Sequence, residues 1–285
     1  MARMNTSLPS IFVSHGSPMI ALEPREAGHF MQHLGAEIVA RWGRPRAVVV
    51  ASAHTLAVHP FDAPVLLAGP RHEAVYDFGG FDQRLSTLRY DAPGAPGLAG
   101  QVQALLRTAG IAVHVADQGG LDHGIWTAMR YLFPEADIPL LPLAWPRDWS
   151  PAQLFALGQA LAPLTAGGVL VMGSGSITHN LRRVFAGGRM PAVDQPVTPE
   201  SHAFREWFAQ RGAAADWPAL FDYRGQAPYA ELMHPTDEHL LPWFVAAGAG
   251  GGATPGRRIH ASFTHGDLGM DAYAFGPSAA ELTAA

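Results

Sequence analysis

The 285-residue chain contains no cysteine. This absence excludes disulfide bridges, zinc ribbons and iron–sulfur clusters, so any bound metal must take nitrogen and oxygen ligands. Charged residues are also few, at 15%, and the formal net charge is −5. The chain has no block of like charge, which argues against nucleic acid or an anionic membrane surface as a partner.

Long apolar runs are missing as well. No stretch reaches the ~18 to 20 apolar residues that a transmembrane helix needs, and the first residues lack the apolar core of a secretory signal. We therefore expect a cytoplasmic protein with no membrane partner. The length allows one large domain or two small ones, and because the chain has no internal repeat and no convincing linker, we expect a single domain over residues 1–285.

Apolar, strand-like runs alternate with amphipathic segments along the chain. The runs at residues 11–13, 47–51 and 169–172 are typical of strands that are buried on both faces of a sheet. Apolar residues recur at helical spacing over residues 26–42 and 97–109. This alternation predicts an α/β fold with a mainly parallel or mixed central sheet, covered by helices on both faces.

Three further segments have sequence features that predict their local structure. Residues 55–96 are rich in proline, glycine and aromatics and are expected to form an irregular insertion, with a short strand near residues 64–67. Thr236 is expected to cap a helix that runs to Ala247. The glycine run at residues 248–252 is expected to be a flexible surface loop.

Five histidines occur in short motifs that suggest a common site. His15, His54 and His179 each follow a strand-like run, whereas His123 and His239 each follow an acidic residue. The carboxyl ends of parallel strands meet at one edge of a sheet, where ligands bind. Neutral imidazole is a common metal ligand and also a general acid or base near neutral pH. The pattern therefore predicts a metal centre with a catalytic group beside it.

Each of these histidines also has a structural alternative, namely an ordinary hydrogen bond in a loop or helix. Glu238 is an alternative metal ligand, because a carboxylate completes the two-histidine triad of many non-haem iron sites. His234 competes with both Glu238 and His239. The small-residue turn at residues 173–176 could cradle a phosphate, but it lacks the lysine and spacing of a P-loop and does not match a nucleophile elbow.

Seven short segments carry a resemblance that covers about residues 10–270, nearly the whole chain, and it implies that the core of the single domain spans this range. They are residues 12–19 (FVSHGSPM), 49–54 (VVASAH), 77–81 (DFGGF), 90–94 (YDAPG), 121–126 (LDHGIW), 174–181 (SGSITHNL) and 236–242 (TDEHLLP). Together they resemble the class III extradiol ring-cleavage dioxygenases, in particular the 4,5-DOPA dioxygenase type. One segment alone is a weak signal, but seven in the same order are specific.

The resemblance implies a non-haem Fe(II) enzyme that opens the ring of a catechol-type substrate with O2, the substrate being DOPA-like or another substituted catechol. The matching metal ligands are His15, His54 and His239. His179 matches the acid/base beside the metal, and the resemblance also allows this histidine to approach the metal as a fourth ligand. His123 matches a second histidine that hydrogen-bonds substrate or oxygen. Zn(II) is an expected occupant of the same site in the isolated protein, and the protocatechuate branch differs by using glutamate as third ligand.

Two other functions remain open from the residues alone. A zinc hydrolase could use three histidines and a water, with His179 as the base, and its reaction would not need oxygen. A non-catalytic binding protein could keep the same fold, because fold does not fix function. The presence of both His123 and His179 argues against the binding protein, which needs no acid/base groups.

Contacts with the substrate are expected from aromatic and arginine side chains. Aromatic residues that could line a ring-binding site are Phe78, Phe81 and Trp126. Arginine recognises carboxylates through two parallel hydrogen bonds. Candidates for holding a substrate carboxylate are Arg71, Arg89, Arg182 and Arg183.

Overall fold

A mixed nine-stranded sheet forms the centre of the protein. The computed structural model describes residues 7–188 and 191–284. The strand order is β10-β13-β1-β9-β2-β8-β4-β7, and β3 pairs with β8 off this path. The strands are β1 (Ser10–Ser14), β2 (Ala47–Ser52), β3 (Leu56–Ala57), β4 (Val65–Leu67), β7 (His114–Ala116), β8 (Leu140–Pro146), β9 (Val169–Gly175), β10 (Arg257–His260) and β13 (Ala272–Phe275).

Four neighbouring strands at the centre of this sheet, β1, β9, β2 and β8, run parallel to one another. Antiparallel pairs, β1 with β13 and β8 with β4, flank this parallel block. The carboxyl ends of the four parallel strands therefore lie at one edge of the sheet. The chain leaves these strands toward His15, His54 and His179, so the topology alone delivers three of the predicted residues to one place.

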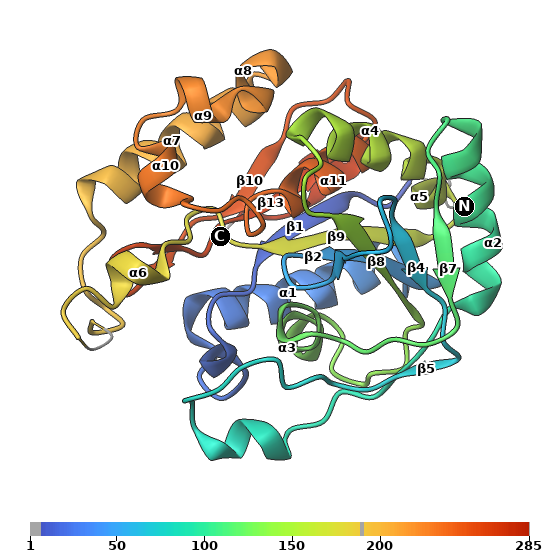
Figure 1. The fold of residues 1–285 in the computed structure, drawn as a ribbon, viewed down its shortest axis with the longest axis horizontal. Coiled ribbons are helices and arrows are strands. Elements are labelled where there is room, and N and C mark those ends of the chain that lie inside the picture. The colour runs from blue at the N-terminus through green and yellow to red at the C-terminus, as the bar shows by residue number, and fades with distance from the viewer. Residues whose placement is uncertain (1–6, 189–190, 285) are drawn as a thin grey trace.

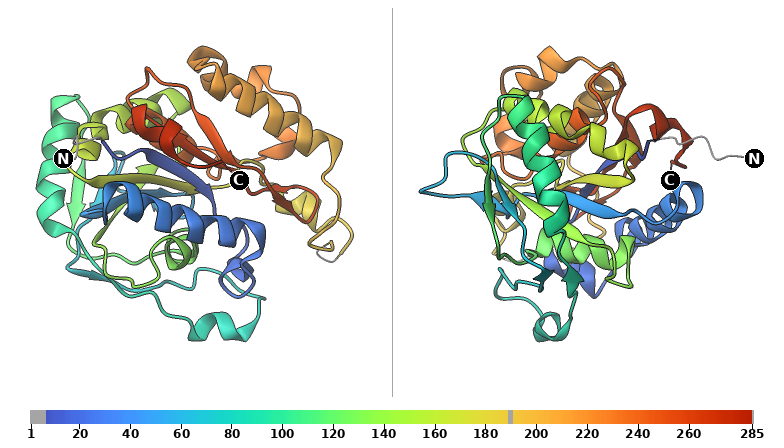
Figure 2. Two further views of the ribbon diagram at one scale, coloured as in Figure 1. Left: turned by 180° about the vertical axis from the view of Figure 1, so that it is seen from behind. Right: turned by 90° about the vertical axis from the view of Figure 1, so that its right-hand side faces the viewer.

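Helices cover both faces of the sheet, as Figures 1 and 2 show. Alternate residues of β2 point to opposite faces, so that Val48 and Val50 enter one apolar core and Val49 enters the other. The first core is completed by α1 and α3, and the second by α2, α4 and α11. These helices are α1 (Arg25–Trp42), α2 (Pro96–Thr108), α3 (His123–Leu132), α4 (Pro151–Leu161) and α11 (Pro242–Ala249). The prediction of a single α/β domain with a mixed, doubly covered sheet is confirmed.

The start of α11 differs from the prediction. The helix begins at Pro242, with Leu241 as its N-cap, rather than after Thr236. Proline is well suited to the first helical position because its missing N–H would have no partner there. The Thr236 hydroxyl instead donates to Glu238 Oε1 at 2.9 Å. Glu238 and His239 therefore lie in the turns before the helix, where their side chains can face the end of the sheet.

The glycine run was also predicted incorrectly in part. Gly248 lies within α11, and a Cβ atom at this position would stand 2.0 Å from the Phe155 carbonyl oxygen of α4. The glycine thus allows two helices to pack backbone against backbone. Only the residues after Ala249 continue as turns.

The insertion over residues 55–96 is better ordered than its composition suggests. The predicted strand near residues 64–67 is confirmed as β4, and β5 (Arg71–His72) pairs with β6 (Ala92–Pro93). Between them lies a short 3-10 helix, η2 (Gln83–Thr87). The last large segment before α11, coloured yellow to orange in Figure 1, consists of five helices: α6 (Leu181–Val184), α7 (Pro199–Ala213), α8 (Trp217–Phe221), α9 (Tyr223–Gln226) and α10 (Ala230–Met233). None of the described helices combines the length and apolar character that crossing a membrane requires.

Candidate metal centre

The structure brings all five predicted histidines together at the carboxyl edge of the sheet. The ring centroid of His54 lies 5.2 Å from that of His15 and 4.1 Å from that of His123. The ring of His239 lies 4.9 Å from His54 and 5.6 Å from His15, and it stacks on His179 at 3.4 Å. We refer to His15, His54 and His123 as the strand-end trio and to His179 and His239 as the stacked pair.

The orientation of His15 is set by strand β9. Its Nδ1 lies 3.0 Å from the Ser174 hydroxyl oxygen, and that hydroxyl donates its only proton to the Gly124 carbonyl at 2.6 Å. The hydroxyl must therefore accept from His15, which places the imidazole proton on Nδ1 and leaves Nε2 with a free lone pair. Gly16 follows with a φ of +63°, a left-handed conformation that glycine adopts without strain and that turns the chain away from the strand.

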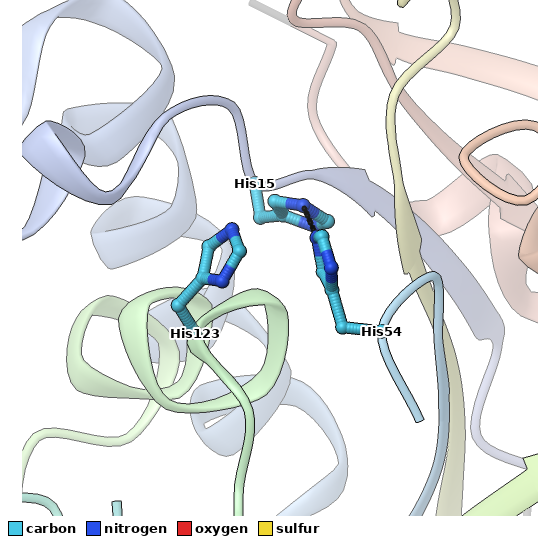
Figure 3. A group of neighbouring side chains, drawn as sticks. All are labelled: His15, His54 and His123. Atoms are coloured by element: carbon cyan, nitrogen blue, oxygen red, sulfur yellow. Dashed lines mark hydrogen bonds between the residues drawn. The ribbon is translucent and has the colours of Figure 1, made fainter. Parts of the chain in front are cut away.

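His54 faces His15 directly. The two Nε2 atoms are 3.3 Å apart, and Figure 3 shows the rings of the trio turned toward one another. The end of β2 is held by Asp122, which accepts from the Ser52 hydroxyl at 2.8 Å. The same carboxylate caps α3 by accepting from the Ile125 backbone N–H. One buried aspartate thus fixes the end of β2 relative to the helix that carries His123.

His123 occupies the first position of α3, and its side chain is held from the far side by Asp77. The Asp77 Oδ1 atom accepts from both the backbone N–H and the ring Nδ1 of His123, each at 3.0 Å. The ring of Phe78 lies edge-on to His123 at 5.7 Å, and Trp126 is 6.4 Å from Phe78. Of the three aromatics predicted for ring binding, Phe78 borders the trio, and both Phe81 and the fully buried Trp126 pack against Phe78.

The stacked pair is supplied by two loops that are tied together by backbone hydrogen bonds. His179 N donates to the Met233 carbonyl at 3.0 Å, and Ser176 N donates to the His239 carbonyl at 2.8 Å. A Cβ atom on Gly175 would lie 2.0 Å from that same carbonyl oxygen, so only glycine allows this approach. The two imidazole planes are inclined by 9°, which places the rings face to face.

The two alternative ligands behave differently from one another. Glu238 Oε1 lies 3.5 Å from His239 Nδ1, and its carboxylate belongs to a group with His179 and His239 whose ligand atoms all lie within 4.8 Å of one another. His234 is outside both groups that could hold a metal among the described residues. Its Nε2 lies 2.7 Å from the Ile177 carbonyl, which can only accept, so this nitrogen is protonated.

Four imidazoles of the cluster have pKa values below the ordinary value of histidine, which favours their neutral form. Burial is the largest cause that lowers the pKa of His15, and neighbouring imidazoles lower it further. Burial followed by the charge of His179 lowers the pKa of His239, and burial lowers the pKa of His179 to about 4. The pKa of His54 is lowered by burial and by His123, although nearby carboxylates oppose the shift. Neutral rings present the lone pairs that a metal ion requires.

A divalent metal fits this donor set. A second group of ligand atoms within 4.8 Å of one another consists of His15, His54 and His123. Two imidazole nitrogens bound to one ion at roughly 2.0 to 2.1 Å lie roughly 3.0 to 3.4 Å apart, and the Nε2 atoms of His15 and His54 are separated by 3.3 Å. Each of His123 and His239 lies beside this His15–His54 pair, so the geometry offers two candidates for a third ligand.

Comparison with known proteins identifies the family. Residues 9–276 match the family described as the catalytic LigB subunit of aromatic ring-opening dioxygenase. The chain belongs to this family. Membership in this dioxygenase family supports a ring-cleaving dioxygenase function, in agreement with the resemblance noted in the sequence.

Similar proteins come from plants, bacteria and fungi. A protein from Beta vulgaris named 4,5-DOPA dioxygenase extradiol is 35% identical over 268 residues, covering 93% of this chain and 96% of the relative. One of the same name from Escherichia coli K12 is 32% identical, with 88% of each chain covered. The crystal structure of uncharacterized protein JW3007 from Escherichia coli K12 superposes with a TM-score of 0.73 at 28% identity, over 94% of this chain and all of that one.

Residues that support the histidines were missing from the sequence-based predictions. Ser174, Asp77 and Asp122 lie inside quoted motifs, but only their motif membership was a signal, because their roles depend on contacts between distant segments. Two of the predicted arginines have internal partners instead of a free guanidinium. Arg183 pairs with Asp267 and Glu200. Arg89 donates to the Ser86 and Leu88 carbonyls.

Proposed function

We propose that this protein is an extradiol dioxygenase that opens the ring of a catechol with O2, and that its substrate is DOPA-like or another substituted catechol. The observation that carries the proposal is the convergence of five histidines on one edge of the sheet, with the Nε2 atoms of His15 and His54 facing each other at 3.3 Å. The substrate class is suggested by relatives named 4,5-DOPA dioxygenase extradiol. The proposed setting is the cytoplasm, with no nucleic acid or membrane partner.

The proposed metal is Fe(II), held by His15, His54 and His239. His239 is favoured as third ligand because it matches the third ligand that the sequence resemblance implies, and because it is buried and its Nδ1 has no hydrogen-bond partner among the described residues. His123, whose Nδ1 bonds Asp77 and whose Nε2 is free, is the alternative third ligand. When bound, Fe(II) would supply a centre that acidifies a catechol and couples it electronically to O2, which zinc cannot do because it is redox-inert.

The acid/base role falls to His179. Its ring stacks on His239, so a catechol held beside His239 would place a hydroxyl within reach of His179. A neutral imidazole would accept the proton of that hydroxyl and later return it to the developing product. General acid/base catalysis of this kind contributes roughly 10² to 10⁴-fold to the rate.

His123 has a separate proposed role at the opposite side of the cluster. Because Nδ1 of His123 donates a hydrogen bond to Asp77, Nε2 is the ring nitrogen that faces His15 and His54. It would accept a hydrogen bond from a substrate hydroxyl. Phe78, edge-on to His123, would provide an apolar wall for the aromatic ring.

To test this proposal, the protein is loaded with Fe(II) without oxygen. Each of a panel of substituted catechols, including L-DOPA, is then added, and the sample is exposed to air. We expect oxygen uptake and a yellow ring-opened product, no turnover with Zn(II), and loss of turnover in His179→Ala. His33→Ala, an exposed histidine of α1, is the matched control. Equal turnover with either metal, or hydrolysis that proceeds without oxygen, would support a zinc hydrolase and refute the proposal.

A further inference from the structure

Asp77 reaches the metal centre from the insertion between β5 and η2, a segment to which none of the proposed metal ligands belongs. The segment is fixed by backbone hydrogen bonds from Val75 N to the Leu121 carbonyl at 2.7 Å and from Leu121 N to the Glu73 carbonyl at 2.9 Å. The Trp126 indole N–H also donates to the Val75 carbonyl at 3.1 Å. The carboxylate is thus held in place by the same segment, residues 121–126, that carries His123.

The two oxygens of Asp77 face two different histidines. Oδ1 accepts both hydrogen bonds from His123, and Oδ2 lies 3.9 Å from Nδ1 of His54. Because Oδ1 accepts the backbone N–H of His123, it also serves as the acceptor toward the ring, so Nδ1 of His123 carries the ring proton.

In the same way, Nδ1 of His15 donates a hydrogen bond to the Ser174 hydroxyl oxygen. Nδ1 of His15 and Nδ1 of His123 therefore each donate to an oxygen, and Nδ1 of His54 lies 3.9 Å from Asp77 Oδ2. An acceptor in this position fixes the tautomer and the orientation of an imidazole, and substitution of such residues typically costs roughly 10 to 100-fold in metal affinity or activity. Asp77 differs from Ser174 in serving two rings and in bringing a negative charge.

We infer that Asp77 is a positioning residue of the metal centre: its carboxylate holds His123 as the Nδ1–H tautomer, with Nε2 directed at the trio, and provides the acceptor toward which Nδ1 of His54 is turned. This inference rests on the proposed function only for its effect on turnover. The tautomer of His123 follows from the hydrogen bonds of this chain whatever reaction it performs.

The test is nitrogen-15 NMR of the imidazole rings in the full-length protein, both stripped of metal and loaded with Zn(II). Long-range couplings distinguish the Nδ1–H from the Nε2–H tautomer, and His123→Asn assigns the signals. We expect His123 as the Nδ1–H tautomer in the wild type and loss of this single-tautomer signature in Asp77→Ala. Asp77→Asn, which keeps the size but removes the charge, covers the case in which the alanine variant does not fold.

The matched control is Asp82→Asn on the same loop. Asp82 caps η2 and pairs with the exposed Arg84, and asparagine caps equally well. We expect Asp77→Asn to lower kcat/KM by roughly 10 to 100-fold, and Asp82→Asn to leave it unchanged. A wild-type His123 in the Nε2–H tautomer, or an Asp77→Asn variant with unchanged tautomer and turnover, would overturn the inference. Failure of every catechol to react, with the NMR result intact, would instead count against the proposed function.

Discussion

The two halves of the histidine cluster are built in different ways. The strand-end trio comes from the ends of β1 and β2 and the start of α3, and hydrogen-bond acceptors stand behind His15 and His123. The stacked pair comes from loops, and Nδ1 of His239 has no hydrogen-bond partner among the described residues. Hydrogen bonds therefore fix the orientation of rings in the trio, whereas the pair keeps ring nitrogens available for a metal and for proton transfer.

The largest effect is expected from His54→Ala. Because this side chain supplies one of the two facing Nε2 atoms, its removal should abolish turnover and weaken metal binding by at least ~100-fold, since even residues behind a ligand contribute 10 to 100-fold. Metal affinity is measured by competition with a chromophoric chelator, and turnover by oxygen uptake. Retained affinity in His54→Ala would show that the trio does not hold the metal.

His179→Gln should separate catalysis from metal binding. Loss of the acid/base is expected to lower kcat by roughly 10² to 10⁴-fold, while the metal content stays at the wild-type level because the proposed ligands His15, His54 and His239 are intact. Steady-state kinetics and elemental analysis of the same sample provide the two readings. A variant that loses its metal along with its activity would make His179 a ligand rather than a base.

His123→Ala and His239→Ala test the boundary between the halves. If His239 is the third ligand, its loss should weaken metal binding by roughly 100-fold, and loss of His123 should weaken it by less than roughly 10-fold. The two variants are compared in the same chelator assay. The reverse order would move the third ligand into the trio and leave the stacked pair for catalysis alone.

A smaller effect concerns pH and stability, and it involves His179 of the stacked pair and its neighbour in the fold, His234. Burial lowers the pKa of His234 to about 3 and of His179 to about 4, so below pH 6.5 the unfolded chain binds protons that the folded chain excludes. Stability should be highest above pH 6.5 and fall as the pH drops from 6.5 toward 4, by at most about 1.4 kcal/mol per pH unit for each fully buried histidine.

Urea unfolding of the metal-free protein at pH 7.5, 6.0 and 5.0 measures this dependence. A His234→Phe variant removes one proton-binding group and should show a shallower slope over the same range. A midpoint that does not change between pH 7.5 and 5.0 would contradict the buried, neutral state of these histidines.

The trio was more accessible to prediction from the sequence than its surroundings. Apolar runs before His15 and His54 indicated parallel strands, and parallel strands place their ends at one edge. The role of Asp77 could not be predicted, because it comes from an insertion without periodicity and acts on a helix more than 40 residues away. The starts and ends of elements were also less predictable: Pro242 rather than Thr236 sets the start of α11, and Gly248 is dictated by close packing on α4.

The most direct test of the central claim is a turnover of the Fe(II)-loaded protein with a reactive catechol under ¹⁸O₂. The product is reduced at once with borohydride, so that a new aldehyde oxygen cannot exchange with water. Its mass is then measured by mass spectrometry. If the histidine cluster opens the ring as a dioxygenase, the product carries both oxygen atoms of one O2 molecule. A product that forms without O2 and carries oxygen from labelled water would contradict the account.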